Sequence, residues 1–120
     1  MRLLPVVAAL GLAVGLAQAE EPGAMLRGLE GWTASPLLTI GDEVAGHRPP
    51  GIPDGIGAFA IDDETVRVFV NHELWRDAGR AYEIGDMEVV GARISAFDLD
   101  RVTREIRAAG IAYARVRDHD

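Results

Sequence analysis

The clearest pattern of apolar and polar positions lies in the middle of the chain. A segment of apolar and small residues, 56–61, is followed by a polar tetrad, 62–65, and then by an alternating segment in which Val66, Val68 and Val70 share one face. A period of two in β-branched residues predicts strands, because successive side chains of a strand point to opposite faces. The two segments are therefore predicted to form a β-hairpin with a four-residue connection.

Weaker patterns on either side predict further strands. Residues 37–40 are a short apolar run before a Gly-Asp-Glu turn, and residues 89–99 and 111–116 are two more strand candidates. Residues 47–55 contain three prolines and two glycines and are expected to be a loop, and residues 77–86 are also expected to be loop-like. The predicted fold class is all-β, with short antiparallel strands.

One stretch, residues 100–109, fits two different structures. A helix there would be capped by Asp100 and ended by Gly110. Its apolar positions would be Val102, Ile106 and Ala109. The same stretch also fits a turn at 98–103 followed by a strand at 104–108. Because so short a helix is marginal without packing, the local sequence leaves both structures open.

Residues 1–19 have the pattern of a secretory signal peptide. Arg2 supplies a positive charge, residues 3–17 form an apolar run, and Ala17-Gln18-Ala19 is a small-x-small cleavage site. The run is shorter than the roughly 20 residues that span a bilayer, so we expect cleavage after Ala19 and no membrane span afterwards. No paired arginines precede the run, which favours the general export route. Residues 20–120 are therefore expected to form a β-rich domain in the periplasm or outside the cell.

Composition narrows the classes of function. The chain has 12 basic residues, all arginine, against 19 acidic ones, for a net charge of −7; such a surface repels nucleic acid. It has no cysteine, which excludes disulfides, thiolate-bound zinc and a thiol nucleophile. Without lysine, G-x-S-x-G or H-E-x-x-H, it has no P-loop, serine-hydrolase elbow or zincin helix. Trp32 and Trp75 could line a pocket, although burial is the commoner fate of such residues.

The first candidate site is Asn71-His72-Glu73, at the end of the most strongly predicted strand. Side chains just beyond a strand end are held by the sheet and open to solvent. Glu73 and Asn71 offer oxygen ligands to a hard cation, and His72 offers a nitrogen that binds a metal or moves a proton. The alternative is a polar strand end whose groups hydrogen-bond to nearby backbone.

The second candidate is Asp54, which stands between Pro53 and Gly55. A carboxylate held in this way suits a metal ligand, although the same tripeptide is typical of a plain β-turn. Further acids occur as Asp42/Glu43, Asp62/Asp63 and Asp98/Asp100. None of these pairs has the spacing of a calcium-binding helix-loop-helix, and Asp62 and Asp63 are expected to be solvated turn residues.

Three longer segments share the pattern of one known family. They are Gly51-Ile-Pro-Asp-Gly-Ile-Gly-Ala-Phe59, Thr65-Val-Arg-Val-Phe-Val-Asn-His-Glu-Leu74 and Gly91-Ala-Arg-Ile-Ser-Ala-Phe-Asp-Leu-Asp100. The strand that ends in Asn-His-Glu, preceded by a glycine-rich acidic loop, is the most specific element. In this order the segments resemble the amino-terminal part of PhoX-type alkaline phosphatases.

The resemblance implies an exported bacterial β-propeller that hydrolyses small phosphate esters. In that family carboxylates hold several calcium ions at the centre of the propeller, with iron in the best-known members. Carried over by motif, Glu73 would be a metal ligand, Asn71 and His72 would shape the strand end around it, and Asp54 would lie near the same face. Calcium is the expected cofactor. Because the family's iron involves a cysteine ligand, thiol-bound iron is not expected within this chain.

The length of the chain limits what the resemblance implies. A propeller needs several four-stranded blades, and residues 20–120 suffice for little more than one. We therefore expect a partial β-propeller, an amino-terminal fragment or truncated relative of the larger fold that is inactive alone. Two alternatives stay open: a non-catalytic exported β-propeller or β-sheet module that binds a partner, and a complete small β-sandwich.

Overall fold

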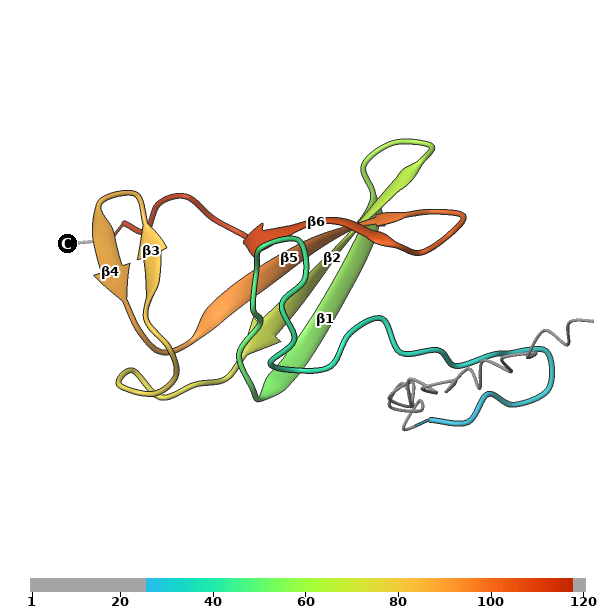
Figure 1. The fold of residues 1–120 in the computed structure, drawn as a ribbon, viewed down its shortest axis with the longest axis horizontal. Helices are drawn as coiled ribbons and strands as arrows, with labels where there is room; N and C mark the ends of the chain where they lie inside the picture. The colour runs from blue at the N-terminus through green and yellow to red at the C-terminus, as the bar shows by residue number, and fades with distance from the viewer. Residues whose placement is uncertain (1–25, 118–120) are drawn as a thin grey trace, which may run out of the picture.

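The computed structural model describes residues 26–117 (Figure 1). The predicted signal peptide, residues 1–19, and His119 lie outside the described residues. Within 26–117 the fold is all-β, as predicted, and no helix there is long and apolar enough to cross a membrane. The strands are β1 (Pro53–Ala60), β2 (Thr65–His72), β3 (Tyr82–Ile84), β4 (Met87–Val89), β5 (Arg93–Asp100) and β6 (Ile106–Ile111).

A four-stranded antiparallel sheet in the order β1-β2-β5-β6 forms the main body of the fold. The other two strands, β3 and β4, follow β2 and precede β5 in the sequence and form a separate antiparallel hairpin beyond one end of the main sheet (Figure 1). The predicted hairpin is confirmed, because β1 pairs with β2 up to Ala60 opposite Val66. Its connection spans residues 61–64, one residue earlier than predicted.

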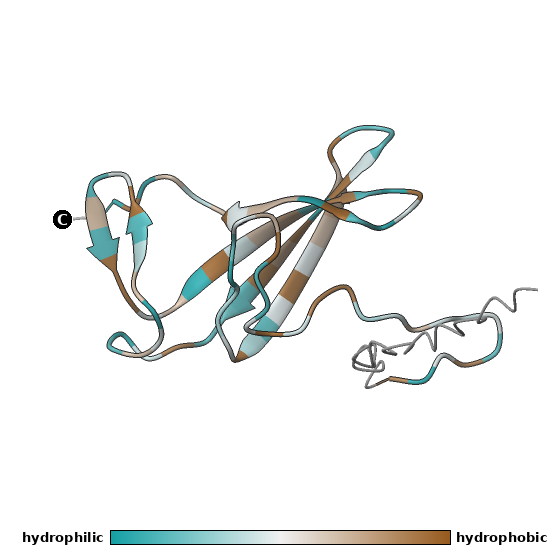
Figure 2. Cartoon of the chain, viewed as in Figure 1, coloured by the Kyte–Doolittle hydropathy of each residue, from teal (hydrophilic) through white to brown (hydrophobic). Residues whose placement is uncertain are grey.

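The two faces of the main sheet differ in burial. The buried residues of β5 are Arg93, Ser95, Phe97 and Leu99, and the residues between them are only partly buried. The alternating valines of β2 lie opposite Leu99, Phe97 and Ser95 and therefore share their face. Figure 2 shows apolar and more polar bands along β1 and β5, and in β5 the buried positions carry both kinds, the polar Arg93 and Ser95 and the apolar Phe97 and Leu99. Within residues 26–117 the buried apolar side chains are Pro49, Ile84, Phe97 and Leu99.

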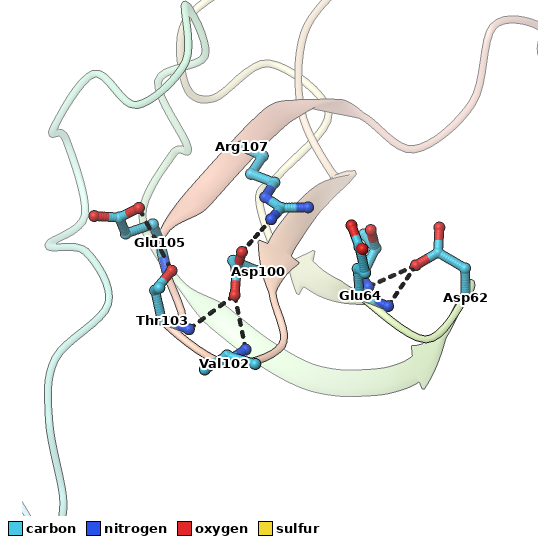
Figure 3. Close-up of polar contacts among 8 residues, drawn as sticks. Asp62, Glu64, Asp100, Val102, Thr103, Glu105 and Arg107 are labelled. Atoms are coloured by element: carbon cyan, nitrogen blue, oxygen red, sulfur yellow. Dashed lines mark hydrogen bonds and ion pairs between the residues drawn. The ribbon is translucent and has the colours of Figure 1, made fainter.

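The two hairpin connections of the sheet are closed in the same way (Figure 3). Oδ1 of Asp62 accepts hydrogen bonds from the backbone N–H groups of Glu64 at 2.8 Å and Thr65 at 2.7 Å. Oδ1 of Asp100 accepts from the N–H groups of Val102 at 2.7 Å and Thr103 at 2.8 Å. An aspartate bonded two and three residues ahead closes a turn, and here a strand follows each turn.

This second turn decides between the two structures that residues 100–109 allowed. The prediction of a turn followed by a strand is correct, and the prediction of a helix is wrong. Asp100 also forms an ion pair with Arg107 across the turn, which ties the turn to the strand that follows it. That strand, β6, begins at Ile106, two residues later than predicted, because the chain passes through Arg104 with a positive φ of 66° before it pairs with β5.

Two of the weaker strand predictions and one loop prediction need correction. Residues 37–40 form no strand, because a short apolar run becomes a strand only where another strand pairs with it. The strand expected at 111–116 is wrong, because β6 already ends at Ile111. Ile111 lies opposite Ser95, and the partner strand β5 begins only two residues before it, at Arg93. The loop expected at 77–86 contains β3.

The strand predicted over residues 89–99 is two strands, β4 and β5, separated at Gly91. Gly91 has a φ of +90°, and a Cβ atom there would lie 2.8 Å from the Cα of Arg76. Only glycine fits such a close approach without displacing the backbone. The apolar pattern continues across this break, so periodicity alone did not reveal it.

The two tryptophans are exposed, contrary to the expected burial. Trp32 is 80% exposed and Trp75 is 82% exposed. Both lie in irregular segments outside the strands, where no face of the sheet covers them.

Candidate functional site

The four predicted ligand residues meet where β1 begins and β2 ends. Antiparallel pairing places Pro53 opposite His72, and the register then shifts between Pro53 and Ile56. As a result Asp54, Asn71, His72 and Glu73 line one hollow of about 370 Å³. The start of β5 and the segment after β6 complete its wall with Ala92, Arg93, Ile94 and Tyr113.

The polar groups of Asp54, Asn71 and Glu73 are exposed in this hollow. The backbone N–H of Glu73 donates to the carbonyl of Ile52 at 2.9 Å, which holds the strand end beside the start of β1. Gly55 makes room for the neighbouring amide, since a Cβ atom at Gly55 would lie 3.1 Å from Nδ2 of Asn71. Within residues 26–117 neither carboxylate forms an ion pair, so both remain available to a ligand.

His72 lies at the inner wall of the hollow and is buried, with 2% of its surface exposed. Its Nδ1 lies 3.2 Å from the carbonyl oxygen of Gly51, and its Nε2 lies 2.9 Å from Oγ of Ser95. The same Ser95 oxygen lies 2.9 Å from Nε2 of His47. One fully buried hydroxyl thus joins two imidazoles and fastens the loop before β1 to the sheet.

The donor and acceptor roles of these groups determine which atom carries the proton in each of these hydrogen bonds. A carbonyl oxygen only accepts, so Nδ1 of His72 donates to Gly51. Nε2 of a neutral His72 then accepts the hydroxyl proton of Ser95, and Nε2–H of His47 donates to that hydroxyl oxygen. Both ring nitrogens of His72 are therefore engaged, and its role at the hollow is to position the strand end.

Burial keeps both imidazoles neutral. It is the main cause that lowers the pKa of His72, assisted by the nearby charge of Arg93 and opposed by hydrogen bonds to the carbonyls of Gly51 and Pro50. Burial also lowers the pKa of His47, followed by repulsion from His72 and Arg93. Neutral imidazoles match the directed hydrogen bonds, in which Nε2 of His72 must accept.

A phenol on the opposite wall is also held in its neutral form. Burial, together with a 3.2 Å hydrogen bond between the hydroxyls of Tyr113 and Tyr82, raises the pKa of Tyr113 to about 12. The hydroxyl is therefore protonated at neutral pH. It adds a polar, uncharged group to a hollow whose other charges come from carboxylates and from Arg93.

The other acid pairs have structural partners. Asp62 and Asp100 close turns. Asp98 forms a two-point ion pair with Arg67 at 2.6 and 2.7 Å, and this hydrogen-bonded partner lowers its pKa. On the amino-terminal side, Asp42 accepts a hydrogen bond from the N–H of Thr39 at 3.1 Å, and Glu43 lies 3.4 Å from Arg48. Each of these carboxylates therefore closes a turn or forms an ion pair, apart from Asp63, which is exposed.

The sequence reasoning missed His47, Ser95 and Arg93. A signal for two of them exists, because Ser95 and Arg93 occupy the buried positions of the alternating strand β5, where polar side chains require partners. His47 has no such signal, since it lies in a proline-rich loop that reaches the sheet only through the tertiary fold.

The donors of the hollow suit a hard cation better than a soft one. Two carboxylates and one amide oxygen are the ligand types of calcium, although within residues 26–117 no group of three or more histidine, aspartate or glutamate side chains gathers in metal-binding geometry. Comparisons of the chain with protein-family models, curated proteins and solved structures give no match. The geometry of the hollow therefore carries the functional argument.

Proposed function

We propose that this chain is part of an exported, PhoX-like phosphatase in which calcium supports the hydrolysis of phosphate esters. The main sheet would be one blade of its β-propeller, and the hollow at the β1–β2 end would contribute ligands to the metal centre. The observation that carries the proposal is the meeting of Asp54, Asn71 and Glu73 in one exposed hollow, beside the buried His72. The three segments that carry the family resemblance form the strands around it.

The topology and the exposed residues of β1 support the blade. Four antiparallel strands that neighbour one another in chain order match the blade of a propeller. Ile56 is 73% exposed on the face of the alternating valines, and Phe59 is 50% exposed on the opposite face. A blade is covered by neighbouring blades on both faces, which would bury both side chains. Those neighbours would lie outside residues 26–117.

Each residue of the hollow has a definable task in this proposal. Asp54 and Glu73 would bind calcium through carboxylate oxygens, with the amide oxygen of Asn71 as a third donor. Bound calcium would neutralise the charge of a phosphate ester and stabilise the charge that develops during hydrolysis. His72 would keep Asn71 and Glu73 in place through its bonds to Gly51 and Ser95.

Calcium binding tests the part of the proposal that belongs to this chain. Isothermal titration of the purified chain with calcium should give a saturable isotherm, weakened at least about tenfold by Glu73→Gln or Asp54→Asn. Glu88→Gln is the matched control, because Glu88 is an exposed acid on β4, away from the hollow. Equal binding by Glu73→Gln and Glu88→Gln would remove Glu73 from the site.

Hydrolysis tests the enzymatic part. In a protein that holds the complete propeller, calcium should support hydrolysis of p-nitrophenyl phosphate, and Glu73→Gln should reduce it at least about a hundredfold. Calcium binding without hydrolysis there would instead indicate the non-catalytic binding module.

A further inference from the structure

A second hollow, of about 450 Å³, lies beside the start of β5 and has a different chemical character. Its walls come from the loop at residues 40–51, from residues 79–82 and from Arg93 and Ile111. Three arginines border it, Arg48, Arg80 and Arg93. In a chain with a net charge of −7, this is a local concentration of positive charge.

The central cation of this hollow is Arg93, which is only 6% exposed. Its Nε–H donates to the carbonyl of Gly91 at 3.1 Å, and one terminal nitrogen donates to the carbonyl of Arg80 at 2.7 Å. Its guanidinium carbon lies 4.0 Å from the centre of the Tyr82 ring. These contacts orient the guanidinium on the side of residues 79–82, although the side chain also borders the first hollow.

No carboxylate within residues 26–117 forms an ion pair with Arg93. A buried cation without a carboxylate partner is costly, because the two carbonyls and the Tyr82 ring beside it replace only part of the hydration that it loses. Burial accordingly lowers the pKa of Arg93, an effect that the two nearby tyrosines only partly oppose. Arginine nevertheless remains protonated in proteins, so the charge persists and an anion would relieve it.

The rim of the hollow adds charge to this centre. Arg48 is partly neutralised by Glu43, which also lines the hollow and whose carboxylate lies 3.4 Å from its guanidinium. Arg80 has no such partner within residues 26–117, and it contacts Arg93 only through its backbone carbonyl. Its guanidinium is therefore available to a ligand independently of that hydrogen bond.

We propose that this second hollow binds a phosphate dianion, with the guanidinium of Arg93 as the central donor and Arg80 at the rim. The Nε–H of Arg93 and one of its terminal N–H groups already donate to carbonyls, so the remaining N–H groups of the two terminal nitrogens would bind the oxyanion. The dianion could be inorganic phosphate or the headgroup of a phosphate monoester, which present the same oxygen atoms. This site uses none of the carboxylates proposed for calcium, so the two proposals can fail separately.

Phosphate titration of the purified chain tests the proposal, in EDTA so that calcium plays no part. At constant ionic strength, inorganic phosphate should bind saturably, whereas chloride and acetate should not. Arg80→Gln should weaken phosphate binding about threefold and Arg93→Lys about tenfold, because lysine keeps the charge but loses the fork. Arg101→Gln is the matched control, since Arg101 is exposed at the distant β5–β6 turn, and it should leave binding unchanged.

The design separates binding from folding. Arg80→Gln keeps the backbone carbonyl that holds Arg93, so its thermal unfolding without phosphate should match that of Arg101→Gln. Phenyl phosphate bound more tightly than phosphate would identify an ester headgroup as the ligand, and equal binding would identify free phosphate. Acetate binding as tight as phosphate binding, or equal phosphate affinity in Arg80→Gln and Arg101→Gln, would overturn the proposal.

Discussion

His72 and Glu73 are neighbours in the sequence, yet their surroundings are opposite. His72 is 2% exposed and both of its ring nitrogens have hydrogen-bond partners. Glu73 is exposed and forms no ion pair within residues 26–117. Successive side chains at a strand end point to opposite sides, so one residue joins the packed side and the next is left open to a ligand.

This contrast separates two kinds of polar residue in the same corner of the fold. The cluster of His47, Ser95 and His72 is closed, because its donors and acceptors satisfy one another. The hollow of Asp54 and Glu73 is open, because its carboxylate oxygens have no such partners among residues 26–117. Polar groups of the first kind stabilise the fold, and groups of the second kind are free to bind. The following predictions test this division, from the largest expected effect to the smallest.

The largest effect is expected from His72→Ala. The change removes the donor to the carbonyl of Gly51 and the acceptor of the Ser95 hydroxyl proton, leaves His47 as a partner of Ser95, and opens a cavity. It should lower the free energy of unfolding by about 3 kcal/mol. Urea denaturation followed by far-UV circular dichroism measures this loss, because both tryptophans are exposed in the folded chain. Asn71→Ala, one residue earlier and exposed, is the control and should cost less than about 1 kcal/mol. Equal losses in the two variants would show that the cluster is not closed.

The next effect is a loss of stability in mild acid. The folded-state pKa values of His47 and His72 lie below the ordinary value of 6.5. At a pH between the folded-state pKa and 6.5, the unfolded chain therefore binds more protons than the folded chain. Stability should therefore be constant above about pH 6.5 and fall as the pH drops through the folded-state pKa values.

Urea midpoints at pH 7.5, 6.5 and 5.5 measure this dependence, and His47→Gln should reduce it. The carboxylates with lowered pKa values, Asp62, Asp98 and Asp100, lose their contribution only at lower pH, because their ordinary value is 3.8. The pH range in which the histidines lose their contribution to stability is thus separate from that of the carboxylates. A midpoint that does not change between pH 7.5 and 5.5 would contradict neutral, buried imidazoles.

A smaller effect is expected from a carboxylate that has partners. Asp100→Ala removes the acceptor that closes the β5–β6 turn, and the melting temperature should fall by about 5 °C, as for a lost helix cap in a domain of this size. Asp63→Ala, an exposed acid in the other connection, is the control. If both variants melt alike, the hydrogen bonds of Asp100 do not stabilise the turn.

The smallest effect on stability is expected from Glu73→Gln. Because the Glu73 carboxylate has no ion-pair partner within residues 26–117, the free energy of unfolding without calcium should change by less than about 0.5 kcal/mol. The same variant should lose most of its calcium affinity. A large loss of stability in the absence of calcium would place Glu73 among the structural residues instead.

Much of the main sheet could be predicted from local pattern. The alternating valines and the polar tetrad before them correctly located the β1–β2 hairpin. The weaker predictions went wrong where the deciding contact lies far away in the sequence. Gly91 separates β4 from β5 because the backbone of Arg76 passes 2.8 Å from the site of its missing Cβ, and no apolar pattern records that approach.

The sequence by itself determined the all-β class, the strongest hairpin and the residues Asp54, Asn71, His72 and Glu73 as candidates for a site. These follow from short-range properties: the period of two along a strand, turn-forming residues, and polar groups at a strand end. Only the tertiary structure decided which of them face solvent. It brought the loop of His47 onto the sheet, buried His72 against Ser95, and left Arg93 without a carboxylate partner within residues 26–117. These outcomes depend on contacts between residues far apart in the sequence, such as His47 with Ser95 and His72 with Ser95. Local sequence patterns do not record such contacts.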